Sequence, residues 1–210
     1  IEFETIKKAG ELLASGETVL VWKKELTEKD GMLCGGSATI YMEVVGREDE
    51  LLILGAGHVG KAVAKAGAFI GFRVTVWDER EEYANRENIS CARTVACPIE
   101  EIFENGITLH ERSYVVIVTR GHALDAEAVA ITDKKPGAYY GMIGSRSKIA
   151  AVRKMLLARG VSEEHLDRLH QPIGLPIKAE TPEEIAVSIL AEIIAVKRGG
   201  DTVGLRSNGR

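Results

Sequence analysis

The sequence predicts an α/β protein: a parallel sheet with helices on both faces, preceded by a small α+β domain. From Leu51 onward, short runs of apolar residues alternate with helical patterns. Short runs that are apolar throughout are typical of strands buried on both faces of a parallel sheet. The first run leads into glycines spaced Gly-x-Gly-x-x-Gly, and the next ends in an acid. This combination predicts a Rossmann-like domain.

Each residue of the glycine motif has a predicted mechanical role. Gly55 permits a tight turn, Gly57 lets the backbone approach a pyrophosphate, and Gly60 lets helix and strand pack closely. The helix that opens at His58 offers free N–H groups and a positive dipole end to a phosphate. Asp78 ends the second apolar run, where an acceptor for a ribose hydroxyl is expected. The alternative is a tight strand-to-helix turn that binds no ligand.

Three segments are expected along the chain: a small N-terminal domain over 1–47, a Rossmann-like domain over 48–198 and a loose tail over 199–210. In the first segment, Glu2–Ser15 has helical spacing, and Gly16 ends it. Thr18–Lys23 and Ala38–Val45 are the expected strands. An antiparallel pair of this size is too small to be stable alone.

The second segment alternates strand and helix. The expected strands are Leu51–Leu54, Arg73–Trp77, Thr94–Ala96, Tyr114–Thr119 and Tyr139–Ile143. The expected helices are His58–Ile70, a short one near Ile99–Glu104, Ala123–Ile131, Ser145–Arg159, a short one from Ser162 and a last one. This last helix begins at Thr181, with a first-turn proline and the glutamate of a capping box, and ends before Gly199.

Composition excludes several classes of function. The chain has 210 residues, a net charge of −4 and only 5% aromatic residues, so it has no general attraction for nucleic acid and few rings for base stacking. No apolar run reaches the about 18 residues that a membrane helix requires. No N-terminal segment has the pattern of a signal peptide, although the chain starts at Ile1 and an upstream segment can be missing. The three cysteines, without CxxC spacing, indicate reduced thiols and a cytoplasmic setting.

Polar residues follow four of the predicted strands. Because parallel strands place their carboxyl ends at one edge of the sheet, these loops are expected to converge there. Arg120, His122 and Arg146 give that edge two guanidinium groups and an imidazole, which suit an anionic ligand. Ser145 and Arg146, which follow Gly144, lie at a predicted helix N-terminus, which is a second place for an anion.

Each of these residues also has a structural interpretation. Ser145 can serve only as a helix N-cap, and Arg146 with Lys148 can form a solvated helix face. His122 is interpreted as a general acid–base group or a ligand contact, or else as a loop residue. Asp125 either orients His122 or occupies the first turn of a helix, where acids are favoured.

Cys34 is the candidate thiol. Gly35 and Gly36 follow it and leave backbone room for a ligand. A thiolate can act as a nucleophile or as a soft metal ligand, whereas a free cysteine is more often a small buried apolar residue. Cys91 and Cys97 lie in or beside an apolar strand and are interpreted as structural. No zinc-site spacing, Ser-His-Asp order or Walker A loop is present.

The chain resembles the xanthine dehydrogenase accessory protein family, XdhC/CoxI, from about Leu12 to Arg198. The glycine loop alone is common, but the Met-x-Cys-Gly-Gly and Gly-Ser-Arg motifs in this order are specific. The matching segments are Gly31–Gly36, Gly55–Gly60, Asp78–Arg80, His122–Asp125, Gly141–Arg146, Pro172–Leu175 and Ala179–Ala186.

The resemblance implies a cytoplasmic maturation factor for molybdenum hydroxylases. Such a protein binds molybdenum cofactor, as molybdopterin or its dinucleotide form, helps it to gain its terminal sulfur and delivers it to the apo hydroxylase. A xanthine dehydrogenase-type hydroxylase and a cysteine desulfurase are the implied partners. Cys34 becomes the implied cofactor- or sulfur-handling thiol. The Gly55–Gly60 loop, His122, Ser145 and Arg146 become the implied pocket.

The chain departs from the family at one motif. The family often has Thr-His-Asp-His where this chain has Thr119-Arg120-Gly121-His122. One imidazole and one carboxylate are replaced by a fixed cation, which weakens a metal-site interpretation and favours phosphate binding. Longer members also have more chain before the segment that matches Ile1.

Two other functions remain open from the sequence. One is an NAD(P)-dependent oxidoreductase, in which Asp78 would favour NAD over NADP because a 2′-phosphate would meet a carboxylate. The other is a nucleotide sensor without catalysis. A homodimer is expected in any case, because a strand pair this small exposes edges that a second chain can cover.

Overall fold

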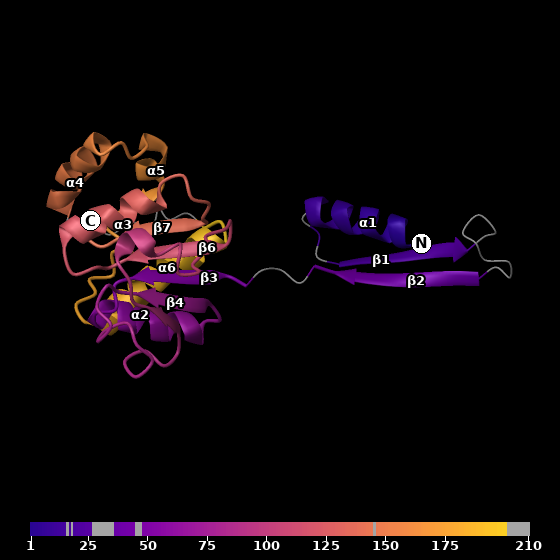
Figure 1. The fold of residues 1–210 in the computed structure, drawn as a ribbon, viewed down its shortest axis with the longest axis horizontal. Helices are drawn as coiled ribbons and strands as arrows, with labels where there is room; N and C mark the ends of the chain where they lie inside the picture. The colour runs from indigo at the N-terminus through magenta and orange to yellow at the C-terminus, as the bar shows by residue number, and fades with distance from the viewer. Residues whose placement is uncertain (16, 18, 27–35, 45–47, 145, 201–210) are drawn as a thin grey trace. The chain divides into compact units, whose positions relative to one another are not determined.

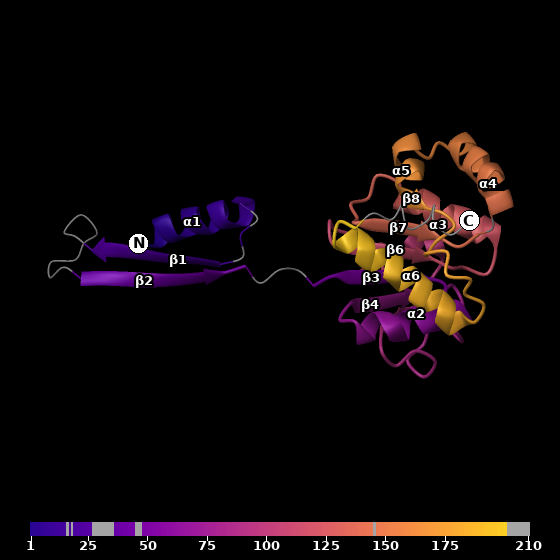
Figure 2. The ribbon, with the colours of Figure 1, turned by 180° about the vertical axis from the view of Figure 1, so that it is seen from behind.

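The structure, a computed structural model, describes residues 1–15, 17, 19–26, 36–44, 48–144 and 146–200, with the backbone alone at 14 and 146–151. The chain divides into two compact units, Ile1–Arg47 and Glu48–Arg210. Figure 1 and Figure 2 show the elements of each unit from two sides.

The first unit is a helix packed on a hairpin. Helix α1 (Glu2–Ser15) lies beside strands β1 (Val19–Leu26) and β2 (Gly36–Glu43), which pair antiparallel (Figure 1). Trp22 lies on the face that α1 covers, with the Lys8 ammonium 5.5 Å from its ring centroid. On the opposite face, Val21 pairs with Tyr41, and both side chains are exposed.

The second unit contains a six-stranded parallel sheet in the order β5-β4-β3-β6-β7-β8. Its strands are β3 (Glu50–Leu54), β4 (Arg73–Trp77), β5 (Arg93–Val95), β6 (Ser113–Ile117), β7 (Tyr139–Met142) and β8 (Leu169–His170). The chain builds the sheet outward from β3 in one direction, then crosses to β6 and builds in the other. This is the strand order of the Rossmann fold, and its reversal lies between β3 and β6.

Helices cover both faces of this sheet. One core contains residues of α2 (His58–Phe69) and α6 (Pro182–Lys197), and these two helices lie side by side in Figure 2. The other core contains residues of α3 (His122–Thr132), α4 (Arg146–Ala158), α5 (Glu163–Arg168) and the 3₁₀ turn η2 (Ile99–Glu101). The predicted fold class is therefore confirmed.

The described elements follow the predicted ones within a few residues, with one strand added. The capping box at Thr181 is present, since its hydroxyl accepts from the Glu184 amide and the Glu184 carboxylate accepts from the Thr181 amide. Strand β8 was not expected, because a strand of two residues has no alternation to detect. Cys97 is buried as expected, but Cys91 is exposed, so its interpretation as a packing residue is wrong.

A buried acid lies inside this largely apolar core. Glu192, on α6, is fully buried, and its Oε2 accepts hydrogen bonds from the Tyr139 hydroxyl at 2.6 Å and the Gly174 amide at 2.9 Å. The neighbouring Tyr140 donates to a neutral acceptor, the Lys135 carbonyl, at 2.8 Å. A buried carboxylate depends strongly on its donors, because it has no water to replace them.

We expect Tyr139→Phe to lower the free energy of unfolding by about 1.5–3 kcal/mol, because it removes a hydrogen bond to a charged group. Tyr140→Phe is the matched control and is expected to cost only about 0.5–1.5 kcal/mol. Urea unfolding of both variants measures the difference. Equal losses would show that Glu192 is not held as a buried charge.

Candidate functional site

The candidate site is at the carboxyl ends of β3 and β6, where the strand order reverses. The Val118 amide donates to the Leu54 carbonyl at 2.8 Å, so the two strands stay paired up to their last residues. The loops that follow then separate to opposite faces of the sheet. In doubly wound sheets, ligands bind at this reversal.

The three motif glycines have three different environments. Gly55 has a φ of +120°, and a Cβ there would lie 2.4 Å from the Val118 carbonyl oxygen. A Cβ on Gly60 would lie 1.8 Å from the Gly55 carbonyl oxygen. A Cβ on Gly57 would meet nothing within 4 Å. Gly55 and Gly60 are thus required by the fold, whereas the space beside Gly57 is open to a ligand.

Helix α2 begins at this open space. Gly57 is its N-cap and makes no side-chain cap hydrogen bond, and His58 in the first turn is exposed. The first amides of a helix have no partner within the helix and form the positive end of its dipole. This end of α2 therefore offers donors to an anion.

A second helix begins at the same edge of the sheet. Gly121 is the N-cap of α3 without a side-chain cap, and a Cβ there would also meet nothing within 4 Å. Asp125, in the first turn, is buried and accepts from the Thr119 hydroxyl at 2.6 Å and the Thr119 amide at 3.2 Å. Burial is the main cause of the raised pKa of Asp125. His122 Nδ1 lies 3.6 Å from Asp125 Oδ2, so Thr119 is the closer partner.

Asp78 is fully engaged at the end of β4. Its Oδ2 accepts from the Ala56 amide at 2.9 Å and from Arg80 Nη2 at 3.0 Å, and its Oδ1 accepts from Arg80 Nε at 2.8 Å. Burial raises the pKa of Asp78, but the hydrogen bonds from Arg80 and Ala56 outweigh it and hold the pKa below its usual value. The ribose contact predicted for Asp78 stays a prediction.

Arg120 pairs with an acid from another strand end. Its Nη2 lies 2.5 Å from Glu79 Oε1. Glu79 follows β4 and Arg120 follows β6, and β3 lies between these strands. The ion pair therefore bridges the end of β3, where the glycine loop begins. Arg120 is 60% exposed, which leaves its guanidinium accessible to an anion at the loop.

Gly144 lies at the same edge, after the carboxyl end of β7, but several other predicted site residues are not placed there. Gly144 ends the β7 loop with open space where a Cβ would point, and α4 begins at Arg146, whose side chain is outside the described part. Ser145, Cys34 and Gly35 also lie outside the described residues. Gly36 begins β2 in the first unit, and the two units are not placed relative to each other. The predicted roles of these residues stay predictions.

The structure adds polar residues that the sequence analysis missed. His170 ends β8 at the same edge of the sheet, stacks on Tyr139 at 4.6 Å between ring centroids and places Nδ1 3.5 Å from Glu192 Oε1. Gln171 follows, and its Oε1 is buried without a hydrogen-bond partner among the described residues. One signal was available: Glu192 lies between Ile189 and Ile193 on the apolar face of the last helix.

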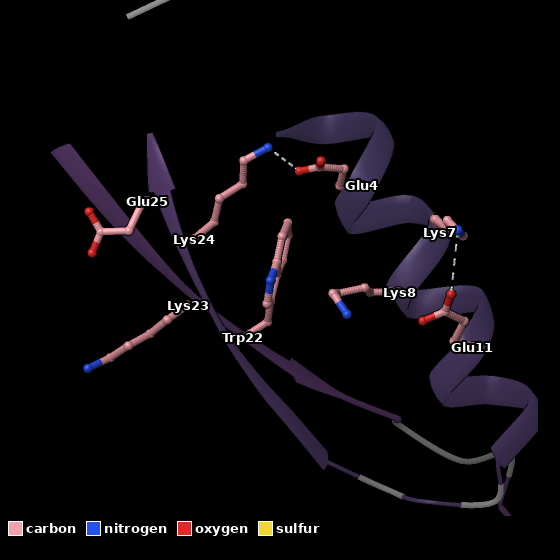
Figure 3. Close-up of a pocket in the computed structure, with 8 residues that line it drawn as sticks. All are labelled: Glu4, Lys7, Lys8, Glu11, Trp22, Lys23, Lys24 and Glu25. Atoms are coloured by element: carbon pink, nitrogen blue, oxygen red, sulfur yellow. Dashed lines mark hydrogen bonds and ion pairs between the residues drawn. The ribbon is translucent and has the colours of Figure 1, made fainter. Parts of the chain in front are cut away.

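A hollow of about 480 Å³ lies between α1 and β1 in the first unit (Figure 3). Its charges are largely matched, because Lys24 pairs with Glu4 and the Lys7 ammonium lies 4.0 Å from Glu11. Trp22 and Lys24 point toward α1, whereas Lys23 points away. The eight lining residues are Glu4, Lys7, Lys8, Glu11, Trp22, Lys23, Lys24 and Glu25. These residues include four lysines and three glutamates, so the hollow carries only a small net positive charge.

Neither a metal cluster nor a membrane span is found in the part of the chain that the structure describes. No group of three or more His, Cys, Asp or Glu side chains is arranged to hold a metal ion there. No described helix is both long and apolar enough to cross a bilayer.

Comparison with known proteins matches the second unit to one family. Residues 51–193 fit the family model of the XdhC Rossmann domain. The chain belongs to the XdhC family. The resemblance inferred from the motifs is therefore confirmed.

The XdhC relatives are longer than this chain. The uncharacterized protein YqeB of Escherichia coli K12 is 36% identical over 173 residues, which are 80% of this chain and 31% of that protein. A probable xanthine dehydrogenase subunit of Bacillus subtilis 168 is 26% identical over 162 residues, which are 77% of this chain and 47% of that protein. This chain thus spans about a third and about half of these relatives.

A solved structure also matches this chain in three dimensions. It is described as a xanthine dehydrogenase from Bacillus halodurans, is 26% identical and superposes with a TM-score of 0.63. The match covers 78% of this chain and 46% of that chain.

The glycine environments predict that two similar substitutions affect stability to very different extents. Gly60→Ala is expected to lower the free energy of unfolding by at least about 2 kcal/mol, because its methyl group would overlap the Gly55 carbonyl. Gly57→Ala is expected to change stability by less than about 1 kcal/mol, because its methyl group enters open space. Chemical unfolding of both variants gives the comparison. Comparable destabilisation of the two variants would contradict the view that the fold requires Gly60 but leaves the space beside Gly57 open.

Proposed function

We propose that this XdhC protein is an accessory factor for a xanthine dehydrogenase-type molybdenum hydroxylase. In this role it binds molybdenum cofactor, assists its sulfuration and delivers it to the apo hydroxylase in the cytoplasm. The family membership and the names of the B. subtilis and B. halodurans relatives support the association with xanthine dehydrogenase. The observation that carries the cofactor proposal is the anion-binding character of the reversal between β3 and β6.

The residues present fit the phosphate end of such a cofactor. Molybdopterin carries a phosphate, and its dinucleotide form carries a pyrophosphate. Space is open where a Cβ on Gly57 or Gly121 would point, at the starts of α2 and α3, and Arg120 pairs with Glu79 across the end of β3. Backbone amides at helix N-termini and an arginine fork are strong phosphate donors. When bound, the cofactor supplies the molybdenum centre that the hydroxylase needs.

Different residues of this chain have different roles in the proposed function. The Gly57 amide region and Arg120 hold the phosphate, and Glu79 competes with it for the guanidinium. His122, exposed at the start of α3, contacts the ligand. Cys34, in the segment that the family motif marks, handles the molybdenum centre or its sulfur. Gly35, Gly36, Gly144, Ser145 and Arg146 complete the proposed site. A cysteine desulfurase supplies the sulfur, and the small first unit pairs with a second copy.

The same edge can in principle accept NAD(P), since its strand order is the one that dinucleotide-binding domains use. The engaged state of Asp78 disfavours that alternative, because an acceptor for the ribose is already occupied. The same occupied carboxylate disfavours a nucleotide sensor whose ligand contains adenosine.

Retention of molybdenum cofactor by the purified protein tests the proposal. We expect the wild-type chain to retain cofactor on gel filtration. Gly57→Ala and Arg120→Ala are each expected to weaken retention by about three- to tenfold, because the first puts a methyl group into the space left for the ligand and the second removes a phosphate contact. Glu79→Gln is expected to strengthen it by about threefold, because Arg120 loses its competing carboxylate. Arg153→Ala, which removes an exposed ion pair with Asp167, is the control. A wild-type protein that retains no cofactor would sink the proposal.

A further inference from the structure

We propose that Arg80 determines the ligand class of the glycine loop. By engaging Asp78, Arg80 closes the position where dinucleotide-binding domains hold the adenosine ribose. The loop then accepts phosphate ligands that bring no ribose diol to that position. This inference rests on the proposed function for the phosphate site and adds a specificity-determining residue to it.

The hydrogen bonds of the Asp78 carboxylate carry this argument. Oδ1 accepts from the Arg80 amide at 3.1 Å and from Arg80 Nε at 2.8 Å. Oδ2 accepts from the Ala56 amide at 2.9 Å and from Arg80 Nη2 at 3.0 Å. A carboxylate has about four lone-pair directions, so these four donors fill it. A ribose diol can bind Asp78 only after Arg80 has left.

Arg80 is held in place from several sides. Its guanidinium centre lies 3.8 Å from the centroid of the Tyr83 ring. The Arg80 carbonyl accepts hydrogen bonds from the Tyr83 and Ala84 amides, so its backbone is part of a turn. A two-point arginine–carboxylate pair is also stronger than the neutral hydrogen bonds that a hydroxyl would offer. A ribose therefore competes poorly with a preformed pair.

The adjacent acid is also paired with an arginine in this structure. Glu79 is the other carboxylate directly after β4, and it is paired with Arg120. Both acids at this strand end thus face an arginine of their own chain. The remaining donors at the glycine loop are amides, which bind a phosphate and cannot accept from a diol.

The experiment compares two nucleotides that differ only in the diol. ADP and 2′,3′-dideoxy-ADP are titrated into the full chain by calorimetry, for the wild type, Arg80→Ala and the control Arg86→Ala. The wild type and Arg86→Ala are expected to bind the two nucleotides within about twofold of each other. Arg80→Ala is expected to favour ADP by about tenfold, because Asp78 can then accept the diol. Because the two nucleotides carry the same charge, the ratio of their affinities does not depend on the positive charge that Arg80→Ala removes.

Arg80→Lys is the second variant, in case Arg80→Ala does not fold. It keeps the positive charge without the two-point geometry, so a smaller preference for ADP of about threefold is expected. A wild type that already favours ADP by about tenfold would overturn the inference. So would Arg80 variants that show no preference, including variants that bind neither nucleotide.

Failure here is distinguishable from failure of the proposed function. If the Arg80 variants gain the preference but the wild type retains no molybdenum cofactor, Arg80 still sets the ligand class and the proposed function falls. If cofactor is retained but the wild type favours ADP over its dideoxy form, Arg80 does not set the ligand class.

Discussion

The close approach of three backbone segments at Gly55 is the constraint on which the second unit depends. The carbonyl of Val118 lies against Gly55 on one side, and the Gly55 carbonyl lies against Gly60 on another. Side chains at these two positions would push apart β3, β6 and α2. Because the strand order reverses between β3 and β6, the same contact fixes where the helix N-termini converge. The loop that packs these segments together is therefore also the one that we propose for ligand binding.

Charge at this edge is arranged by pairing acids with arginines. Asp78 and Glu79 follow β4, and each is matched by a guanidinium from Arg80 or Arg120. The Asp78–Arg80 pair is largely buried and is joined by two side-chain hydrogen bonds, so Arg80 stays bound to Asp78. The second is exposed and bridges the end of β3, so an anion can displace Glu79 from Arg120. The two pairs differ in burial, and our proposals assign them different roles: the Asp78–Arg80 pair restricts the ligand, and the Glu79–Arg120 pair responds to it.

Local patterns in the sequence predicted most of the fold. The glycine spacing, the apolar strands and the Thr181 cap each depend on residues close in the chain, and the structure contains all three. Strand β8 was missed because its two residues gain their place only by pairing with β7. The candidate site was predicted in part. Strand ends gave its location, but the pairing of Arg120 with Glu79, 41 positions apart, is set by tertiary packing. The Glu192 network with Tyr139 and Gly174 is likewise visible only after folding.

The loop at Gly57 and the start of α3 act, in our central claim, as one phosphate site. The most direct measurement is an NMR titration of the full chain with inorganic pyrophosphate, following backbone amides. We expect the largest shifts at residues 57–60 and 120–123, saturating together with one dissociation constant. Shifts confined to the lysines of the hollow beside α1, or separate saturation of the two segments, would contradict this claim.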